Sequence, residues 1–234
     1  MATMGPKTAV SSADTDALDR LLKGRWSCRG YLPDGVPREA IERVLELAQR
    51  TPSWCNSQPW HVLVTEGDGT ERFRRMLTKH VAEAPMEPDF EFPRRYTGVY
   101  QERRREVAWQ LYESVGVAYG DREGSAAQTA KNFEFFGAPH VAVITTEADL
   151  GTYGAVDCGL YVQSFLLAAQ SLGLGAIPQA ALASHAPAVK EFFGLPASRS
   201  IVCGISFGLP DPDHPANQFR TERAPAESAV TWVD

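Results

Sequence analysis

The amino-acid sequence predicts a sandwich of helices and strands, of either the α/β or the α+β class. Two observations carry this prediction. Runs with apolar residues every three or four positions alternate with short apolar segments of strand length, and the alternation continues nearly to the C-terminus. A length of 234 residues also suits one substantial core better than two domains. We therefore expect a flexible tail at residues 1–13 and a single domain at residues 14–234.

The first third of the chain is expected to hold three helices and one strand. Leucines lie on one face of residues 14–24, and Gly24 ends that helix. Pro37, which is favoured in a first helical turn, opens a second helix that runs toward Thr51. Residues 61–65 read as a buried strand, and the helical pattern returns over residues 70–83.

Residues 84–128 differ in character, because they are rich in proline and charge and contain one expected helix, over residues 103–117. Such a segment in a compact chain is more often an excursion or a lid than core. Its run "QERRRE" is either a solvated helix face or an anion site.

The last elements follow in quick succession. Residues 139–146 form an apolar strand, and residues 155–175 form a helix that is nearly apolar all round, as in a helix buried on several sides or at a subunit interface. Gly173 or Gly175 ends this helix. A short strand carries "AIPQAA", Ser184 is expected to cap a helix ending at Phe193, and "SIVCGISFGLP" forms the last strand. Residues 210–234 are expected to be a C-terminal extension.

Composition narrows the classes of partner. The net charge is −6 and the pI is about 5.4, which argues against nucleic acid and anionic membranes. No apolar run has membrane-spanning length, and the first residues do not resemble a secretory signal. The 4 cysteines are scattered without a C-x-x-C pair, which fits neither a zinc site nor a disulfide framework. We expect a reduced, cytoplasmic protein without a metal.

Several common catalytic motifs are missing from the sequence. It contains no phosphate-binding P-loop and no G-x-G-x-x-G after a strand. Its 5 histidines have no metal-ligand spacing, and no G-x-S-x-G elbow is present.

Arginine-rich loops remain at the two ends of the chain. "RWSCR", from Arg25 to Arg29, follows a helix stop, and "RTER", from Arg220 to Arg223, lies in the tail. Guanidinium groups bind phosphate in a bidentate manner, so the two clusters could hold one phosphate between them. Ordinary surface arginine is the alternative.

Taken together, four motifs resemble the FMN-dependent nitroreductase family: "RWSCRGY", "TPSWCNSQPWHVLV", "DCGLYVQSFLLAAQSLGLGAIPQ" and the tail "FRTERAPAESAVTW". The resemblance covers both ends and the middle of the chain, but not the excursion. It implies an α+β fold, a three-layer α-β-α sandwich with a central mixed, mainly antiparallel sheet, in an intertwined homodimer with FMN at the subunit interface.

The resemblance also implies roles for individual residues. Arg25 and Ser27 would hold the phosphate and ribityl chain, joined by tail arginines, and Arg29 would lie near flavin N1 and O2. The loop after the second helix would reach a flavin bound mainly by the other subunit, with Trp60 anchoring it. The implied cofactor-binding residues are Arg25, Trp26, Ser27, Arg29, Pro52, Ser53, Trp54, Cys55, Asn56, Pro178, Gln179, Ala180, Arg220 and Arg223. For Gln58, Lys131 and Asn132, flavin contact and a scaffolding role both stay open.

As a reaction, the resemblance implies ping-pong hydride transfer from NADH or NADPH, through flavin N5, to an electron-poor acceptor such as a nitroaromatic or a quinone. Arg29 would stabilise the negative charge of reduced flavin, and no side chain would act as a nucleophile. Four aromatic residues of the excursion either roof the pocket or pack a helix: Phe90, Phe92, Tyr96 and Tyr100.

Other functions stay open at this point. Relatives of the same fold include dehalogenases, dehydrogenases that use oxygen, and enzymes that consume the flavin itself. A non-catalytic module that sequesters flavin is an alternative from another class. Acceptor-dependent oxidation of NADH or NADPH distinguishes a reductase from an oxygen-using enzyme and from a binding module.

Overall fold

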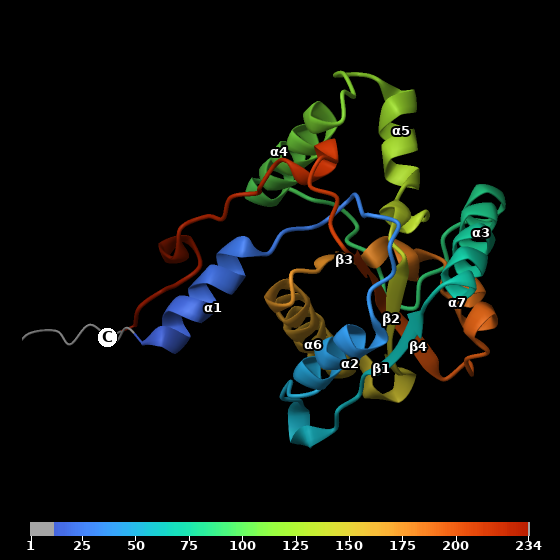
Figure 1. Ribbon diagram of the computed structural model, residues 1–234, viewed down its shortest axis with the longest axis horizontal. Coiled ribbons are helices and arrows are strands. Elements are labelled where there is room, and N and C mark those ends of the chain that lie inside the picture. The colour runs from blue at the N-terminus through green and yellow to red at the C-terminus, as the bar shows by residue number, and fades with distance from the viewer. Residues whose placement is uncertain (1–11, 234) are drawn as a thin grey trace, which may run out of the picture.

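The computed structural model describes residues 12–233. Most of the expected tail at residues 1–13 lies outside the described residues, and Ser12 and Ala13 are the N-cap and first residue of a helix. Four strands form a sheet in the order β1-β2-β4-β3, and every neighbouring pair is antiparallel (Figure 1). The strands are β1 (His61–Thr65), β2 (His140–Glu147), β3 (Gly175–Gln179) and β4 (Arg199–Gly208). Parallel pairing occurs as isolated bridges, at Ser27–Ala176 and Glu87–His185. The sheet is therefore mainly antiparallel, as expected.

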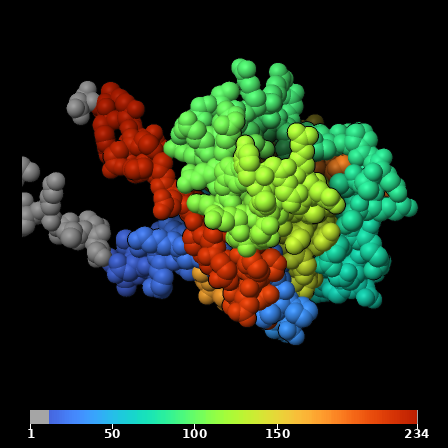
Figure 2. Space-filling model, turned by 90° about the horizontal axis from the view of Figure 1, so that it is seen from above, coloured from blue at the N-terminus to red at the C-terminus, as the bar shows by residue number. Residues whose placement is uncertain are grey.

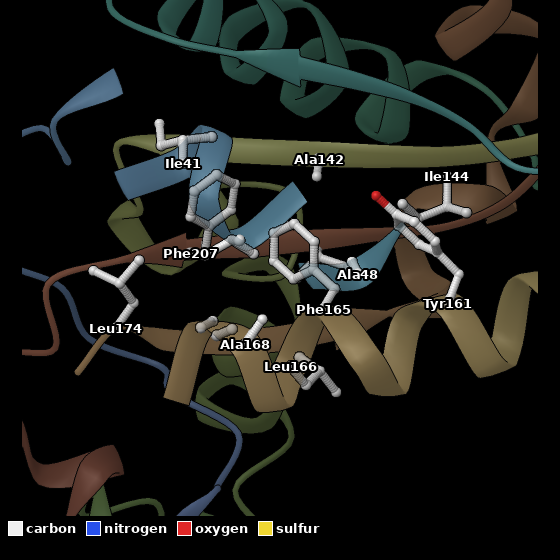
Figure 3. Packing of buried hydrophobic residues seen from close by; sticks show 14 of the residues in the cluster. Ile41, Ala48, Ala142, Ile144, Tyr161, Phe165, Leu166, Ala168, Leu174 and Phe207 are labelled. Carbon is white, nitrogen blue, oxygen red and sulfur yellow. The ribbon is translucent and has the colours of Figure 1, made fainter. Parts of the chain in front are cut away.

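One face of the sheet is covered by α2 (Arg38–Ala48) and α6 (Gly151–Ser171). Successive residues of β2 point to opposite faces, so Ile144 faces these helices together with Phe207 of β4. Figure 3 shows Phe165 and Tyr161 of α6 packed into this layer. Residues of α2, β2, α6 and β4 thus form one core.

The other face is covered by α3 (Asp68–Glu83) and α7 (Ala186–Phe193). Phe73 of α3 packs on Phe135 and Phe192, with ring centroids 5.0 Å apart in both pairs. Val141 and Val143, the alternate residues of β2, join this second cluster. Helices on both faces of one sheet give the three-layer α-β-α sandwich that the resemblance implied.

Three further helices lie outside these layers: α1 (Ala13–Gly24), α4 (Val99–Ser114) and α5 (Arg122–Ala130). The helices α4 and α5 form the excursion, which stands at one end of the sheet with the C-terminal segment beside it (Figures 1 and 2). Neither α1 nor α4 has a buried residue. Within residues 12–233, no helix combines the length and the apolar character needed to cross a bilayer.

Two local predictions differ from the structure. The sequence pattern predicts one helix in the excursion, but α5 is a second, with Asp121 as its N-cap accepting a hydrogen bond from the Gly124 amide. Ser184 does not cap α7. Its hydroxyl donates to the Ala181 carbonyl oxygen, 2.6 Å away, within a 3-10 turn, and His185 occupies the N-cap position.

Candidate functional site

The segment from Arg25 to Arg29 lies along β3. Ser27 forms the parallel bridge with Ala176, and the Cys28 amide donates to the Ala176 carbonyl oxygen over 3.2 Å. The segment thereby extends the edge of the sheet. Arg25–Arg29 and Pro178–Ala180, which are about 150 residues apart in sequence, come together at this edge.

Arg29 is held at several points within this segment. Its amide donates to Oδ1 of Asn217 (2.8 Å), and its Nη1 donates to the Ser27 carbonyl oxygen (3.2 Å). The guanidinium carbon lies 5.9 Å from the ring centroid of Phe136 and 6.0 Å from that of Phe219. Burial lowers the pKa of Arg29 from its ordinary value, because it removes the charged form from water.

Asn217 joins the C-terminal tail to the same segment. Its Nδ2 donates to the carbonyl oxygens of Gly30 (2.9 Å) and Asp211 (2.8 Å), while its Oδ1 accepts from Arg29. The tail approaches so closely that a Cβ on Gly30 would lie 2.1 Å from Cγ of His214. Glycine is therefore required at position 30 for this tail to dock.

The docked tail carries its arginines to the first cluster. The Arg220 guanidinium lies over the ring of Trp26, 4.2 Å from the centroid, and its Nη1 donates to the Asn217 carbonyl oxygen over 2.6 Å. Burial, and then the positive charge of Arg223, lower the pKa of Arg25. The positive charge of Arg223 thus acts on the Arg25 guanidinium.

These arginines form no ion pair with any acidic residue that the structure describes. None of the ion pairs in the described part of the chain includes Arg25, Arg29, Arg220 or Arg223. The indole Nε1 of Trp26 is buried without a hydrogen-bond partner. Four guanidiniums outside these ion pairs and one orphaned donor are a fitting environment for a polyanion.

A cleft of about 570 Å³ adjoins the tail arginines, between α4 and residues 221–225. Arg103, Glu106 and Gln110 of α4 face Arg223 across it. The charge run "QERRRE" is thus partly a cleft wall, although the two carboxylates of Glu106 and Glu222 also line the cleft.

The end of β3 combines exposed and buried positions. Pro178 and Ala180 are exposed, whereas Gln179 is buried. Oε1 of Gln179 accepts a hydrogen bond from the Ser206 hydroxyl, and Nε2 donates to the carbonyl oxygen (2.9 Å) and Oδ1 (3.2 Å) of Asn132. The side chain of Gln179 is therefore scaffolding, and this stretch presents its backbone outward. Asn132 supports the same strand end, which agrees with its scaffolding alternative.

The second predicted group, Pro52 to Asn56, lies elsewhere. Ser53 is half-buried, whereas Pro52, Trp54, Cys55 and Asn56 are exposed. The loop contacts the first half of α6, where the Trp54 amide donates to Oδ2 of Asp157 over 3.1 Å. The first group instead packs on β3, which follows the last turn of α6. The helical rise from Asp157 to Ser171 alone amounts to roughly 20 Å. One chain does not bring the two groups together (Figure 1).

Trp60 and Gln58 fix the base of this loop. Trp60 is buried, stacks on Tyr161 with ring centroids 5.0 Å apart, and donates through Nε1 to Oε1 of Gln49 over 2.9 Å. Gln49 in turn donates to Oε1 of Gln58 over 3.0 Å. Trp60 is an anchor, as expected, and Gln58 also has a scaffolding role.

Sequence reasoning did not predict a role for Asn217 or Asp157. Both act by bonding backbone groups of residues 103 or more positions away. No local sequence pattern marks such a residue. The role of a buried asparagine in a polar tail, or of a lone aspartate in an apolar helix, can be recognised only from the contacts in the folded structure.

Comparison with known proteins identifies the family. The sequence profile described as "Nitroreductase family" matches residues 22–209. The chain belongs to the nitroreductase family. This match spans the arginine segment, the Pro52–Asn56 loop and β3.

Individual members of the nitroreductase family are similar over nearly their full length. Nitroreductase NfnB of Mycolicibacterium smegmatis is 36% identical over 209 residues, which are 89% of each chain. A 4-nitrobenzoate reductase of Nocardioides sp. is 34% identical over 226 residues, covering 93% of this chain and 90% of its own. The crystal structure of FMN-dependent NfnB from Mycobacterium smegmatis in complex with NADPH has a TM-score of 0.89 at 34% identity, covering 94% of this chain and 99% of that one.

Proposed function

We propose that this chain is an FMN-dependent NAD(P)H oxidoreductase that reduces nitroaromatic compounds, and that it works as a homodimer. The observation that carries the proposal is the cluster of four arginines beside the exposed end of β3, none of which belongs to an ion pair among residues 12–233. Bound FMN supplies a ring that takes a hydride from a nicotinamide and gives it to an acceptor.

The residues present fit FMN in charge and shape. Arg25, Arg220 and Arg223 match a phosphate dianion, and Ser27 adds a hydroxyl next to them. Arg29 lies at the other end of the same segment between the rings of Phe136 and Phe219. A cation with a partly apolar surrounding suits a flat ring that becomes negatively charged on reduction, because the low dielectric strengthens the attraction.

The protein itself would orient the flavin ring and stabilise its charge. The exposed backbone at Pro178–Ala180 would orient the ring, and Arg29 would stabilise negative charge at its polar edge. No nucleophilic side chain is required. The four cysteines are free thiols, which supports a reducing compartment such as the cytoplasm.

A second copy of the chain would complete the site. The Pro52–Asn56 loop is exposed and far from the arginine cluster of its own chain. Beside it, α6 exposes Tyr153 (61%), Val156 (50%) and Leu160 (46%), which form an apolar surface on the side of the helix away from the core. An interface here would bury that surface and deliver the loop to the partner's flavin.

Nitroaromatic acceptors are favoured by the names of the relatives. Besides 4-nitrobenzoate reductases, a chloronitrobenzene nitroreductase of Comamonas testosteroni is 29% identical over 219 residues. NADPH is favoured as donor, because it is the nucleotide bound in the crystal structure of the similar NfnB. Quinones are the second class of acceptor to assay.

The first experiment is a visible spectrum of the purified protein, followed by anaerobic addition of NADPH and then NADH. Flavin bands that bleach with either nucleotide and return with 4-nitrobenzoate support the proposal. A reduced sample that is reoxidised by oxygen but not by nitroaromatics or quinones would indicate an oxygen-using enzyme. A colourless protein that takes up no added FMN would overturn the proposal.

The role of the arginine cluster in FMN binding is tested with Arg25→Ala, and Arg43→Ala is its control. Arg43 is an exposed arginine paired with Glu46 on α2, remote from the cluster. We expect the dissociation constant of FMN to rise at least tenfold in Arg25→Ala and to stay unchanged in Arg43→Ala. Sedimentation velocity of both proteins tests the dimer directly.

A further inference from the structure

The loop from Ser53 to Gln58 has an unfavourable backbone conformation, which contacts with its surroundings must stabilise. Cys55, Asn56 and Gln58 have φ angles of 53°, 55° and 46°, in the left-handed region that favours glycine. Residues with side chains adopt this region at a cost in free energy, and they keep it only where neighbouring contacts hold the chain. Three such residues within four positions make the loop dependent on those contacts.

Some of the contacts are internal. The Gln58 amide donates to Oγ of Ser53 over 2.9 Å, and the Asn56 amide donates to the Ser53 carbonyl oxygen over 3.0 Å. The side chain of Gln58 joins the loop to Gln49 at the end of α2. These bonds close the turn on itself and on its base, but they do not fix where its tip lies relative to α6.

Asp157 supplies that missing restraint. Oδ2 of Asp157 accepts the Trp54 amide over 3.1 Å, and among the described hydrogen bonds of residues 52–58 this is the one that reaches beyond residue 60. One helical turn earlier, Tyr153 contacts the Trp54 ring edge-on, with centroids 4.5 Å apart. The loop tip is thus fixed to α6 by one hydrogen bond and one ring contact.

The carboxylate of Asp157 has an unusual setting for a charged group. Its residue is only 6% exposed, and it belongs to none of the ion pairs found between residues 12 and 233. A buried carboxylate is costly unless hydrogen-bonded, and a bond from an amide to a charged acceptor is stronger than one between neutral groups. Packing on an apolar helix alone would favour an aliphatic residue at this position.

We infer that Asp157 is a positioning residue, which holds the Trp54 amide so that Ser53 and Asn56 stay in the conformation that contacts the flavin of a second copy. The inference rests on the proposed function, because flavin contact by this loop is part of that proposal. Asp157 acts through the loop. Its removal should therefore affect flavin binding without removing any group that touches the flavin.

The test uses Asp157→Ala, Asp157→Asn and a control, Asp149→Ala. Asn keeps an oxygen acceptor of similar shape, and Asp149 is an exposed acid just before α6. Hydrogen exchange of the loop amides is measured on the full-length protein freed of flavin, and the FMN dissociation constant is measured separately. In Asp157→Ala we expect both the exchange rate and the dissociation constant to rise at least tenfold. Asp157→Asn should recover most of both, and Asp149→Ala should change neither.

A double-mutant cycle tests whether Asp157 acts through the loop. Asn56→Ala should weaken FMN binding in the wild-type background and weaken it much less in the Asp157→Ala background, because the loop is then already displaced. Additive effects would contradict the inference.

A second pair of variants covers the case in which Asp157→Ala does not fold. Trp54→Pro removes the amide donor from the exposed loop, whereas Trp54→Ala keeps it. We expect the FMN dissociation constant to be at least tenfold higher in Trp54→Pro than in Trp54→Ala.

Three further results would overturn the inference. The first is unchanged loop exchange in Asp157→Ala, and the second is faster exchange with unchanged FMN affinity, since Asp157 would then be purely structural. The third is a wild-type protein that binds no FMN. That result also ends the proposed function, and it is recognisable because the exchange measurement needs no flavin.

Discussion

The two halves of the proposed site are built in opposite ways. Around Asn217, the tail and the Arg25–Arg29 segment are joined by several hydrogen bonds, a ring contact and a close approach at Gly30. The loop at Pro52–Asn56 is mostly exposed, has a strained backbone, and contacts α6 through one hydrogen bond to Asp157 and one ring contact with Tyr153. The first half can form within one chain, whereas the second half needs the flavin site of another chain to contact.

The largest expected effect comes from breaking the first half. Asn217→Ala removes a buried side chain that makes three hydrogen bonds. The Arg29 amide then loses its partner, and the Gly30 and Asp211 carbonyl groups each lose one of their donors. We expect the free energy of unfolding to fall by about 3 kcal/mol. Urea denaturation measures this, with the exposed Gln218→Ala as control. A loss as small as that of the control would mean that the tail docks without Asn217.

Arg29→Gln tests the chemistry of the same half. It removes the cation and keeps a polar side chain, so the rate of acceptor-dependent NADPH oxidation should fall about 100-fold. Arg29→Lys should recover part of this loss. Stopped-flow reduction of the FMN-saturated protein locates the defect in the hydride-transfer steps. An unchanged rate would place the stabilising charge elsewhere.

Acid should weaken the contact between β2 and the segment that leads into α2. His140 is buried, its Nε2 accepts the Val36 amide over 2.9 Å, and its Nδ1 lies 3.2 Å from the Thr65 carbonyl oxygen. Burial lowers the pKa of His140 below its ordinary value of 6.5. Protonation would break the bond from Val36, so His140 contributes stability above pH 6.5 that is lost as the pH falls through the lower folded-state value.

Urea midpoints between pH 7.5 and 5 measure this dependence, and each pKa unit of difference corresponds to about 1.4 kcal/mol. In His140→Gln, which cannot ionise, the dependence should be flatter. Equal slopes in both proteins would assign the acid sensitivity to other groups.

The smallest effect is expected in the loop, with the opposite sign. Cys55→Gly relieves the positive φ of one exposed residue, so the free energy of unfolding should rise by about 0.5 kcal/mol or stay level. FMN should bind more weakly, because the loop then has more freedom to leave its conformation. Thermal unfolding without flavin and FMN titration separate the two effects. A clear loss of stability would mean that the Cys55 side chain makes contacts that outweigh the strain.

Much of the fold was predictable because its signals are periodic. The strand at residues 61–65 and the nearly all-apolar helix α6 follow from alternation and length. The helix α5 was not predictable, since "REGSAAQTA" contains a glycine and no apolar stripe, and it depends on the Asp121 cap. Serine is a residue type that often caps helices, but the Ser184 hydroxyl donates a hydrogen bond within a 3-10 turn instead.

The site was predictable only as a set of motifs. Their order led to the nitroreductase family, and the structure brings the arginine segment, β3 and the tail together as the resemblance implied. It also separates the Pro52–Asn56 loop from them. Sequence could not reveal that Asn217 and Asp157 hold the two halves, because each bonds a backbone amide, and an amide is present at almost every position.

The bond between Arg29 and Asn217 joins residues 188 positions apart. During synthesis, the N-terminal arginines leave the ribosome long before the tail that docks on them, and Arg223 follows later still. A nascent chain can therefore assemble much of its sheet while the phosphate end of the site is still open. Binding of FMN by these arginines would therefore follow the synthesis of the segment that carries Arg220 and Arg223.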